Sequence, residues 1–153
     1  MAKFSGCMSL FFIISVSALT GSASSKHDPG QCPIGMEGHY KITDTSDMNV
    51  YVQRNADKNL VIYFQIENGS ASEPSVVDGK YTTVTYVGDD GKIFDAGKKI
   101  SYCRKSAVYA IFESNGRSPI ESNTSITTVV PGGLQVQQIE PVKSDSKVWP
   151  RVK

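Results

Sequence analysis

The stretch Asn59–Glu67, NLVIYFQIE, carries the clearest structural signal in the chain. Its apolar side chains fall on every second residue, at Leu60, Ile62, Phe64 and Ile66. Because successive side chains of a β-strand point to opposite faces, this spacing predicts a strand with one buried face.

Short runs rich in Val, Ile, Tyr and Thr lie on both sides of this stretch, and residues typical of turns separate them. Residues 88–91, Gly-Asp-Asp-Gly, are a strong hairpin signal between two such runs. We predict further strands at residues 36–43, 49–54, 80–87, 92–95, 100–105, 107–113, 122–130 and 134–142. Residues 75–77 and 148–152 are read either as short strands or as connecting segments. The runs 100–105 and 107–113 are read either as two strands or as one bent strand.

The spacing of these runs is nearly regular, and no window of 11 residues repeats its apolar side chains with the helical period of 3.6. This pattern is typical of an all-β domain. We predict that residues 34–153 form a single antiparallel β-barrel of eight or nine strands. A Greek-key β-sandwich is the alternative.

The first 23 residues have the composition of a secretory signal peptide. Lys3 precedes an apolar run at residues 10–19, and the small residues Gly21-Ser22-Ala23 follow it. We therefore predict cleavage near Ala23 and a secreted or periplasmic protein; an uncleaved N-terminal anchor is the alternative. Residues 24–33 are polar and predict a flexible lead to the domain.

Cleavage would remove Cys7 and leave two cysteines, Cys32 and Cys103. In an oxidising compartment such a pair predicts a disulfide, which would close a loop of about 70 residues and stabilise the fold by roughly 4 kcal/mol in the chain-entropy model. Two separate buried thiols are the alternative. Two distant cysteines and few histidines do not predict a zinc site, so we expect no metal.

Charge argues against a nucleic-acid partner. The chain has 16 Lys and Arg against 15 Asp and Glu, and loss of the signal removes the one-charge excess. A protein that neutralises many phosphates needs a surplus of cations. We also expect no membrane span in the mature chain and no cofactor, since no glycine-rich phosphate loop joins a strand to a helix.

Residues suited to catalysis are sparse. His27 lies in the predicted lead, where we expect it to be solvated, and His39 is the only histidine within the domain. A Ser nucleophile would need a histidine and a carboxylate nearby, and the usual Gly-x-Ser-x-Gly turn is absent from the sequence. A carboxylate pair such as Glu67 with Glu113 leaves open the alternative of an envelope polysaccharide hydrolase. We therefore expect no catalytic residue, while the question of an enzyme stays open.

Two triplets, at Asn68 and Asn123, have the form of N-glycosylation acceptors. They matter only in a eukaryotic secretory pathway. Asp89-Asp90-Gly91 lacks the spaced ligands of a calcium loop, so we interpret it as a solvated hairpin tip.

The run Gly38-His39-Tyr40 resembles the Gly-x-Trp at the start of calycin barrels, the superfamily of lipocalins, fatty-acid-binding proteins and avidins. In that superfamily a basic residue from the end of the chain packs across the aromatic ring and seals the barrel. The resemblance therefore implies a barrel-closing pair of Tyr40 and Arg151 joined by a cation–π contact. The start at Cys32-Pro33 also resembles small uncharacterised secreted bacterial proteins.

All seven tyrosines lie on predicted strands, where they suit packing or a ligand site. If the barrel encloses a cavity, we expect Tyr86 and Tyr109 to line it, on faces shared with Val84 and Ile111. The preferred hypothesis is a non-enzymatic binding protein that takes a small apolar ligand, or contacts an envelope or host protein, such as a secreted hydrolase, through its loops. A structural protein of a surface or matrix is a further alternative.

Overall fold

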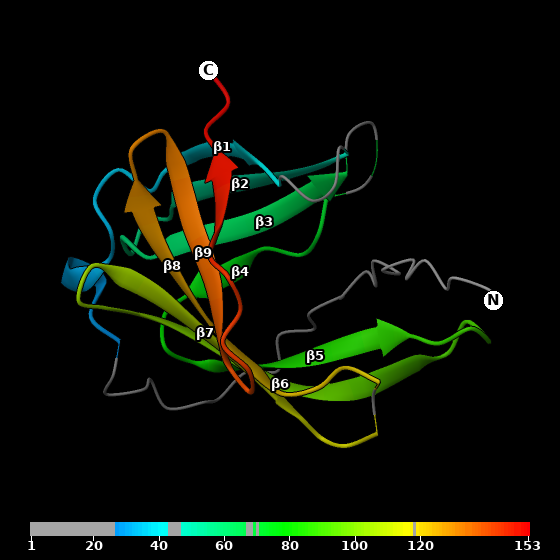
Figure 1. Cartoon of the computed structure of the whole chain (residues 1–153). Helices are drawn as coiled ribbons and strands as arrows, with labels where there is room; N and C mark the ends of the chain where they lie inside the picture. The colour runs from blue at the N-terminus through cyan, green and yellow to red at the C-terminus, as the bar shows by residue number, and fades with distance from the viewer. Residues whose placement is uncertain (1–26, 43–46, 67–68, 70, 118) are drawn as a thin grey trace.

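The computed structural model describes residues 27–42, 47–66, 69, 71–117 and 119–153, and in these residues it is built of antiparallel β-strands. Figure 1 shows two sheets, one of four and one of six strands. The described part contains no α-helix, only the short 3-10 helix η1 (Pro29–Gln31), and hence no helix long and apolar enough to cross a membrane. The all-β prediction is confirmed.

The first sheet forms from consecutive strands in the order β1-β2-β3-β4. Its members are β1 (Gly38–Lys41), β2 (Met48–Arg54), β3 (Leu60–Ile66) and β4 (Ser75–Val77). The predicted strand at residues 59–67 corresponds to β3, and the alternating apolar side chains Leu60, Ile62 and Phe64 face the core as expected. Leu60 is fully buried, and Ile62 and Phe64 pack on the same core.

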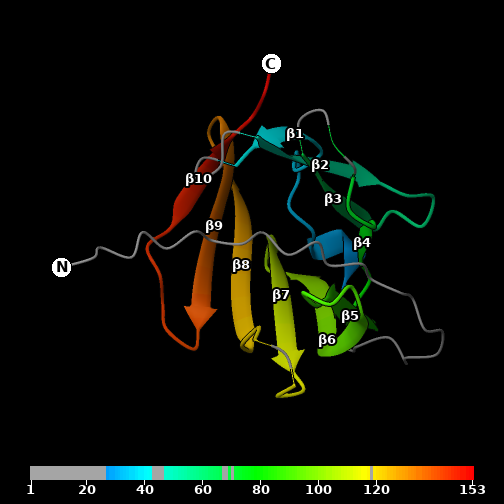
Figure 2. The same cartoon turned by 90° about the vertical axis from the view of Figure 1, so that its right-hand side faces the viewer.

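The second sheet also follows chain order, β10-β9-β8-β7-β6-β5, and Figure 2 shows its six strands side by side. Its members are β5 (Tyr81–Val87), β6 (Ile93–Arg104), β7 (Ala107–Ser114), β8 (Asn123–Val130), β9 (Gly133–Glu140) and β10 (Lys147–Pro150). In both sheets each hydrogen-bonded neighbour is the next strand along the chain, so neither sheet contains a Greek-key crossover among its described strands.

Strand β6 differs from the prediction, because it joins the predicted runs 92–95 and 100–105 into one strand. A β-bulge lies near Gly97, which has a φ of 143°. A Cβ at this position would lie 2.0 Å from the carbonyl oxygen of Glu113 on β7, so only glycine allows the two strands to approach. The runs 100–105 and 107–113 are two strands joined at Lys105 and Ser106, which both have positive φ.

The main core lies between the two sheets. Buried side chains from both sheets and from the segment before β1 form one cluster: Cys32, Met36, Tyr40, Val50, Val52, Leu60, Val77, Cys103, Val108 and Leu134. A smaller cluster of Val84, Ala96 and Phe112 lies on β5, β6 and β7. The two sheets therefore share one apolar core, and strands β5, β6 and β7 carry a second, smaller apolar cluster.

The predicted signal peptide, residues 1–23, lies outside the described residues. The predicted lead is described from His27 onward, and there the chain is hydrogen-bonded to β6 and to Asn59, the residue before β3. The half-buried His27 bonds Asn59 through Nε2 at 3.0 Å and accepts from the backbone N–H of Cys103 through Nδ1 at 3.1 Å. The expectation that His27 is a solvated side chain was wrong.

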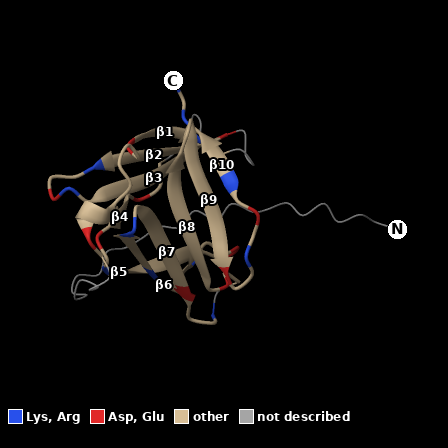
Figure 3. Cartoon of the chain, turned by 60° about the vertical axis from the view of Figure 1, so that its left-hand side comes forward, with Lys and Arg blue, Asp and Glu red and all other residues tan. Residues whose placement is uncertain are grey.

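Charged residues of both signs are interspersed, chiefly in the turns and near the strand ends (Figure 3). This distribution accompanies nearly equal numbers of basic and acidic residues in the chain.

Candidate functional site

A disulfide joins Cys32 and Cys103, as predicted. Their Cα atoms lie 4.7 Å apart, and both side chains belong to the main core. The bond attaches the segment before β1 to the end of β6, 71 residues later. It therefore connects two distant segments of the chain within the main core.

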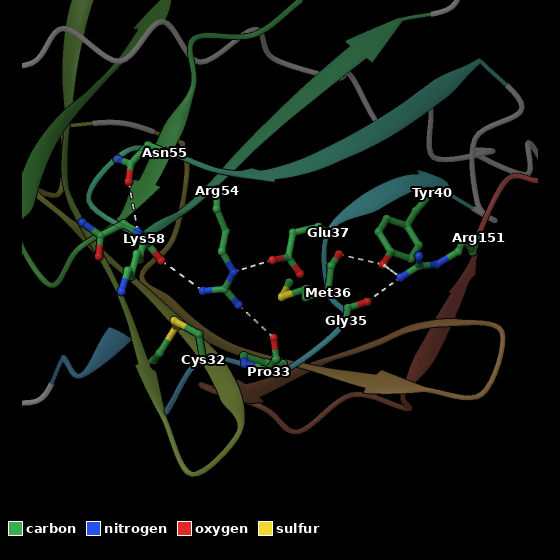
Figure 4. Close-up of polar contacts among 12 residues, drawn as sticks. Cys32, Pro33, Gly35, Met36, Glu37, Tyr40, Arg54, Asn55, Lys58 and Arg151 are labelled. Carbon is green, nitrogen blue, oxygen red and sulfur yellow. Dashed lines mark hydrogen bonds and ion pairs between the residues drawn. A yellow bond between two sulfur atoms is a disulfide. The ribbon is translucent and has the colours of Figure 1, made fainter. Parts of the chain in front are cut away.

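The structure brings together Tyr40 on β1 and Arg151, which follows β10 (Figure 4). The two residues form an isolated antiparallel bridge, and the N–H of Val152 donates to the carbonyl oxygen of His39 at 2.9 Å. The Tyr40 hydroxyl accepts from Arg151 Nη2 at 2.6 Å and donates to the carbonyl oxygen of Met36 at 2.7 Å. The edge strands β1 and β10 of the two sheets are therefore linked through side chain and backbone.

The contact between Arg151 and Tyr40 includes the expected cation–π geometry and adds a hydrogen bond to it. The guanidinium carbon lies 5.2 Å from the ring centroid, and the shortest contact is the hydrogen bond to the hydroxyl. Arg151 also donates to the carbonyl oxygen of Gly35. Burial raises the pKa of Tyr40 despite the opposing charge of Arg151, so the hydroxyl remains a donor at neutral pH.

Gly38 explains why the motif begins with glycine. Its φ is 154°, and a Cβ there would lie 3.2 Å from the Cζ atom of Arg151. A side chain at this position would press on the guanidinium that bonds Tyr40.

A second guanidinium, that of Arg54 on β2, fastens the segment between Cys32 and β1. It forms an ion pair with Glu37 and donates to the carbonyl oxygens of Lys58 at 3.0 Å and Pro33 at 3.4 Å (Figure 4). Burial alone would raise the pKa of Glu37, but its backbone hydrogen bond and Arg54 outweigh this effect and lower it. These contacts attach the segment between Cys32 and β1 to β2.

The predicted ligand-lining tyrosines lie on opposite faces of the six-stranded sheet. Tyr86 on β5 packs with the cluster that contains Phe112 and stacks on Phe94, with ring centroids 5.3 Å apart. Tyr109 on β7 is an odd number of residues from Phe112 and therefore points the other way. It stacks on its cross-strand neighbour Tyr102, also at 5.3 Å. The two side chains do not face one common space.

The inner face of the second sheet carries a row of small side chains. Ser101, Ala110 and Ser125 are direct cross-strand partners on β6, β7 and β8. They share their face with Cys103 and Val108, which belong to the main core. Small side chains in a row leave more room above the sheet than the Val and Leu side chains of the core.

The first sheet presents half-buried apolar side chains on its own inner face. Ile62 and Phe64 pack against the main core but are not fully covered. The ring of Phe64 meets Trp149 of β10 edge-on, with centroids 6.4 Å apart. The side chains around the disulfide are thus fully buried, whereas Ile62 and Phe64 keep part of their surface exposed.

Lys99 lies on the same inner face, and the sequence analysis missed it. It lies four residues before Cys103 on β6. Because side chains of a strand alternate between its two faces, Lys99 and Cys103 point to the same face. Its Nζ donates to Ser75 Oγ of β4 at 2.8 Å, which places the ammonium between the two sheets. No carboxylate among the described residues forms an ion pair with it. Burial lowers the pKa of Lys99.

An aromatic row crosses the other face of the first sheet. His39, Tyr51 and Tyr63 are cross-strand partners on β1, β2 and β3. The ring of Tyr51 stacks on His39 at 4.4 Å and on Tyr63 at 5.2 Å. His39 Nε2 bonds Asn49 Oδ1 at 2.8 Å. His39 therefore has an amide and a ring as its contacts among the described residues, and the structure does not bring it to a serine–carboxylate pair.

The other candidates from the sequence are dispersed. Glu113 is exposed and accepts from the Tyr81 hydroxyl at 3.2 Å, whereas Glu67 and Asn68 lie outside the described residues. Asn123 is half-buried on β8. Within the described ranges no three His, Cys, Asp or Glu side chains gather to hold a metal ion.

No protein-family model matches the chain, and none of the curated proteins or solved structures matches it either. The resemblance to the calycins stays a prediction.

Proposed function

We propose that the protein is an exported, non-enzymatic binding protein that holds a small, largely apolar ligand between the inner faces of its two sheets. The observation that carries the proposal is the contrast within the interior. The side chains around the disulfide are fully buried. Farther along, the interior combines the small row Ser101–Ala110–Ser125 with the half-buried Ile62 and Phe64.

The same proposal takes the two sheets as one closed barrel. Two contacts support closure at the β1–β10 edge, namely the Tyr40–Arg151 bridge and the backbone hydrogen bond from Val152 to His39. At the other edge, the N–H of Gly79 after β4 donates to the carbonyl oxygen of Ser101 on β6 at 2.9 Å. A closed wall would exclude water from a ligand on all sides except the ends.

Trp149 provides the experiment, because it is the only tryptophan of the chain and packs on Phe64. The purified protein is titrated with a neutral naphthylamine dye, and both the dye emission and the Trp149 emission are followed. We expect saturable binding with energy transfer from Trp149. In parallel, native mass spectrometry of the protein isolated from its source is expected to show a bound small molecule.

Filling the interior provides the matched control. Ala110→Phe adds a ring to the small row, and we expect it to weaken dye binding at least about fivefold, since overfilling a site costs on the order of 1–3 kcal/mol. Thr83→Phe adds the same ring to β5 on the opposite face, where Thr83 pairs with the exposed Lys98, and should leave binding unchanged. Absence of dye binding together with a clean apo mass would contradict the proposal.

A further inference from the structure

We propose that Lys99 is the anion site of the interior and that the ligand is a monocarboxylate with an apolar body, such as a medium-chain fatty acid. The inference rests on the proposed function, because it names the class of ligand that the interior would take.

The first argument is the position of the ammonium. Lys99 projects from β6 onto the face of Ser101 and Phe112, and its Nζ reaches Ser75 of the other sheet. An ammonium has three N–H donors, and Ser75 Oγ is its only hydrogen-bond partner among the described residues. Donor capacity therefore remains free inside the interior.

The second argument is the missing counter-charge. The ion pairs of the described residues are Arg54–Glu37, Lys80–Asp78 and Lys92–Asp90, and none involves Lys99. A buried lysine is ordinarily paired, because removing a single charge from water is costly. A ligand carboxylate would supply the charge that the chain leaves out.

The chemistry of the surroundings selects the ligand class. One ammonium and a neighbouring hydroxyl match a single negative charge, whereas a phosphate ordinarily attracts guanidinium groups or several donors. The apolar side chains on the same level, Ile62 beside Ser75 and Phe112 beside Lys99, suit a hydrocarbon body.

The test compares two probes that differ only in the head group, dodecanoate and 1-dodecanol, by displacement of the neutral dye at pH 7. We expect dodecanoate to bind at least about tenfold more tightly, which corresponds to a charge-assisted hydrogen bond of about 1.5 kcal/mol or more. Lys99→Met should remove this preference by lowering the affinity for dodecanoate to about that for 1-dodecanol. Lys99→Arg should retain it.

Lys98→Met is the matched control, because Lys98 is the exposed neighbour of Lys99 on the opposite face, across from Glu113. We expect it to keep the preference for dodecanoate. Thermal unfolding of each variant verifies that it is folded, and Ser75→Ala provides a second variant that leaves Lys99 in place and should weaken dodecanoate binding to a smaller extent.

The outcomes separate the two proposals. Equal affinity for both probes in the wild type, or a preference that survives Lys99→Met, overturns the carboxylate site and leaves the binding function standing. Failure of both probes and of the dye overturns the binding function itself, and the carboxylate site with it.

Discussion

The guanidinium of Arg151 donates a 2.6 Å hydrogen bond to the hydroxyl of Tyr40, 111 residues earlier in the chain. Tyr40 is completely buried and belongs to the first strand, whereas Arg151 follows the last strand. The hydroxyl also donates to the carbonyl oxygen of Met36, so one side chain connects the two chain ends and the segment between Cys32 and β1. Local sequence cannot enforce such a contact, and its contribution is measurable.

Tyr40→Phe should reduce the free energy of unfolding by about 1–3 kcal/mol, because the Met36 carbonyl loses its donor and the Arg151 guanidinium loses an acceptor. Arg151→Met should cost about 1–2 kcal/mol through loss of the bonds to Tyr40 and Gly35. Urea unfolding measures both values. In the double variant the two effects should be coupled by at least about 0.5 kcal/mol.

Lys153→Met is the control for this cycle, because it removes a nearby positive charge from an exposed terminal residue. We expect no change beyond about 0.5 kcal/mol. Strict additivity of Tyr40→Phe and Arg151→Met would show that the contact does not contribute to stability.

The Cys32–Cys103 bond gives a second prediction. Replacing both cysteines by alanine should reduce the free energy of unfolding by about 2–5 kcal/mol, because the unfolded chain is no longer constrained by a loop of 71 residues and the core loses two sulfur atoms. Urea unfolding with and without dithiothreitol measures the effect. The reductant should destabilise the wild type and leave the double variant unaffected; a wild type that loses the bond without losing stability would contradict the prediction.

Sequence periodicity predicted most of the strands because they alternate as half-buried strands do. It failed at Gly97 in β6, and it left the turn that follows β6 undecided. Gly97 looks like an interruption, although the close approach of the Glu113 carbonyl requires a glycine inside the strand. The turn at Lys105 and Ser106 has positive φ values that these residue types do not signal.

The candidate site was less predictable than the fold. The Cys32–Cys103 pair could be inferred because only two cysteines would remain after cleavage of the predicted signal peptide. Arg151 was inferred from the resemblance of Gly38-His39-Tyr40 to the start of calycin barrels. Lys99 was missed because the dipeptide Lys98-Lys99 looks like solvated charge. Side chains two and four residues apart in a strand share a face, so Lys99 lies on the same face as the buried Cys103 and its neighbour Lys98 does not. This alternation would have placed Lys99 on the inner face.

The aromatic row on the first sheet gives a third prediction. Tyr51 stacks on both His39 and Tyr63, and aromatic pairs contribute about 0.5–1.5 kcal/mol each beyond their buried area. Tyr51→Ala should therefore cost about 1–3 kcal/mol in urea unfolding, whereas Tyr51→Phe keeps both stacked pairs and should cost less than about 0.5 kcal/mol. Gln53→Ala, on the same face of β2, is the matched control. Equal losses for Tyr51→Ala and Gln53→Ala would contradict a stabilising role for the row.

The buried ammonium of Lys99 gives the last prediction, which concerns stability without ligand. Burial lowers its pKa in the folded state, whereas an unfolded lysine titrates near about 10.4. Between these two values the unfolded chain binds a proton that the folded chain does not bind, so Lys99 makes stability rise with pH. Below the pKa of the folded state, the full cost of burying the charge lowers the stability of the folded protein. Above the pKa of the unfolded state this cost is absent. Its facing neighbours Ser75, Thr82 and Phe112 do not titrate.

Lys99→Met removes this dependence. The stability of the variant relative to the wild type should therefore be greatest below the folded-state pKa of Lys99. It should fall as the pH rises through that pKa toward the unfolded value. Urea unfolding at five or six pH values measures the difference. Burial raises the pKa values of Tyr40 and Tyr102, but their contribution to the pH dependence cancels because both proteins contain them. Lys98→Met should give a curve parallel to the wild type, since that ammonium is exposed. A Lys99→Met curve that is also parallel to the wild type would show that the ammonium keeps its water in the folded protein, and the interior would then have no uncompensated charge to offer a ligand.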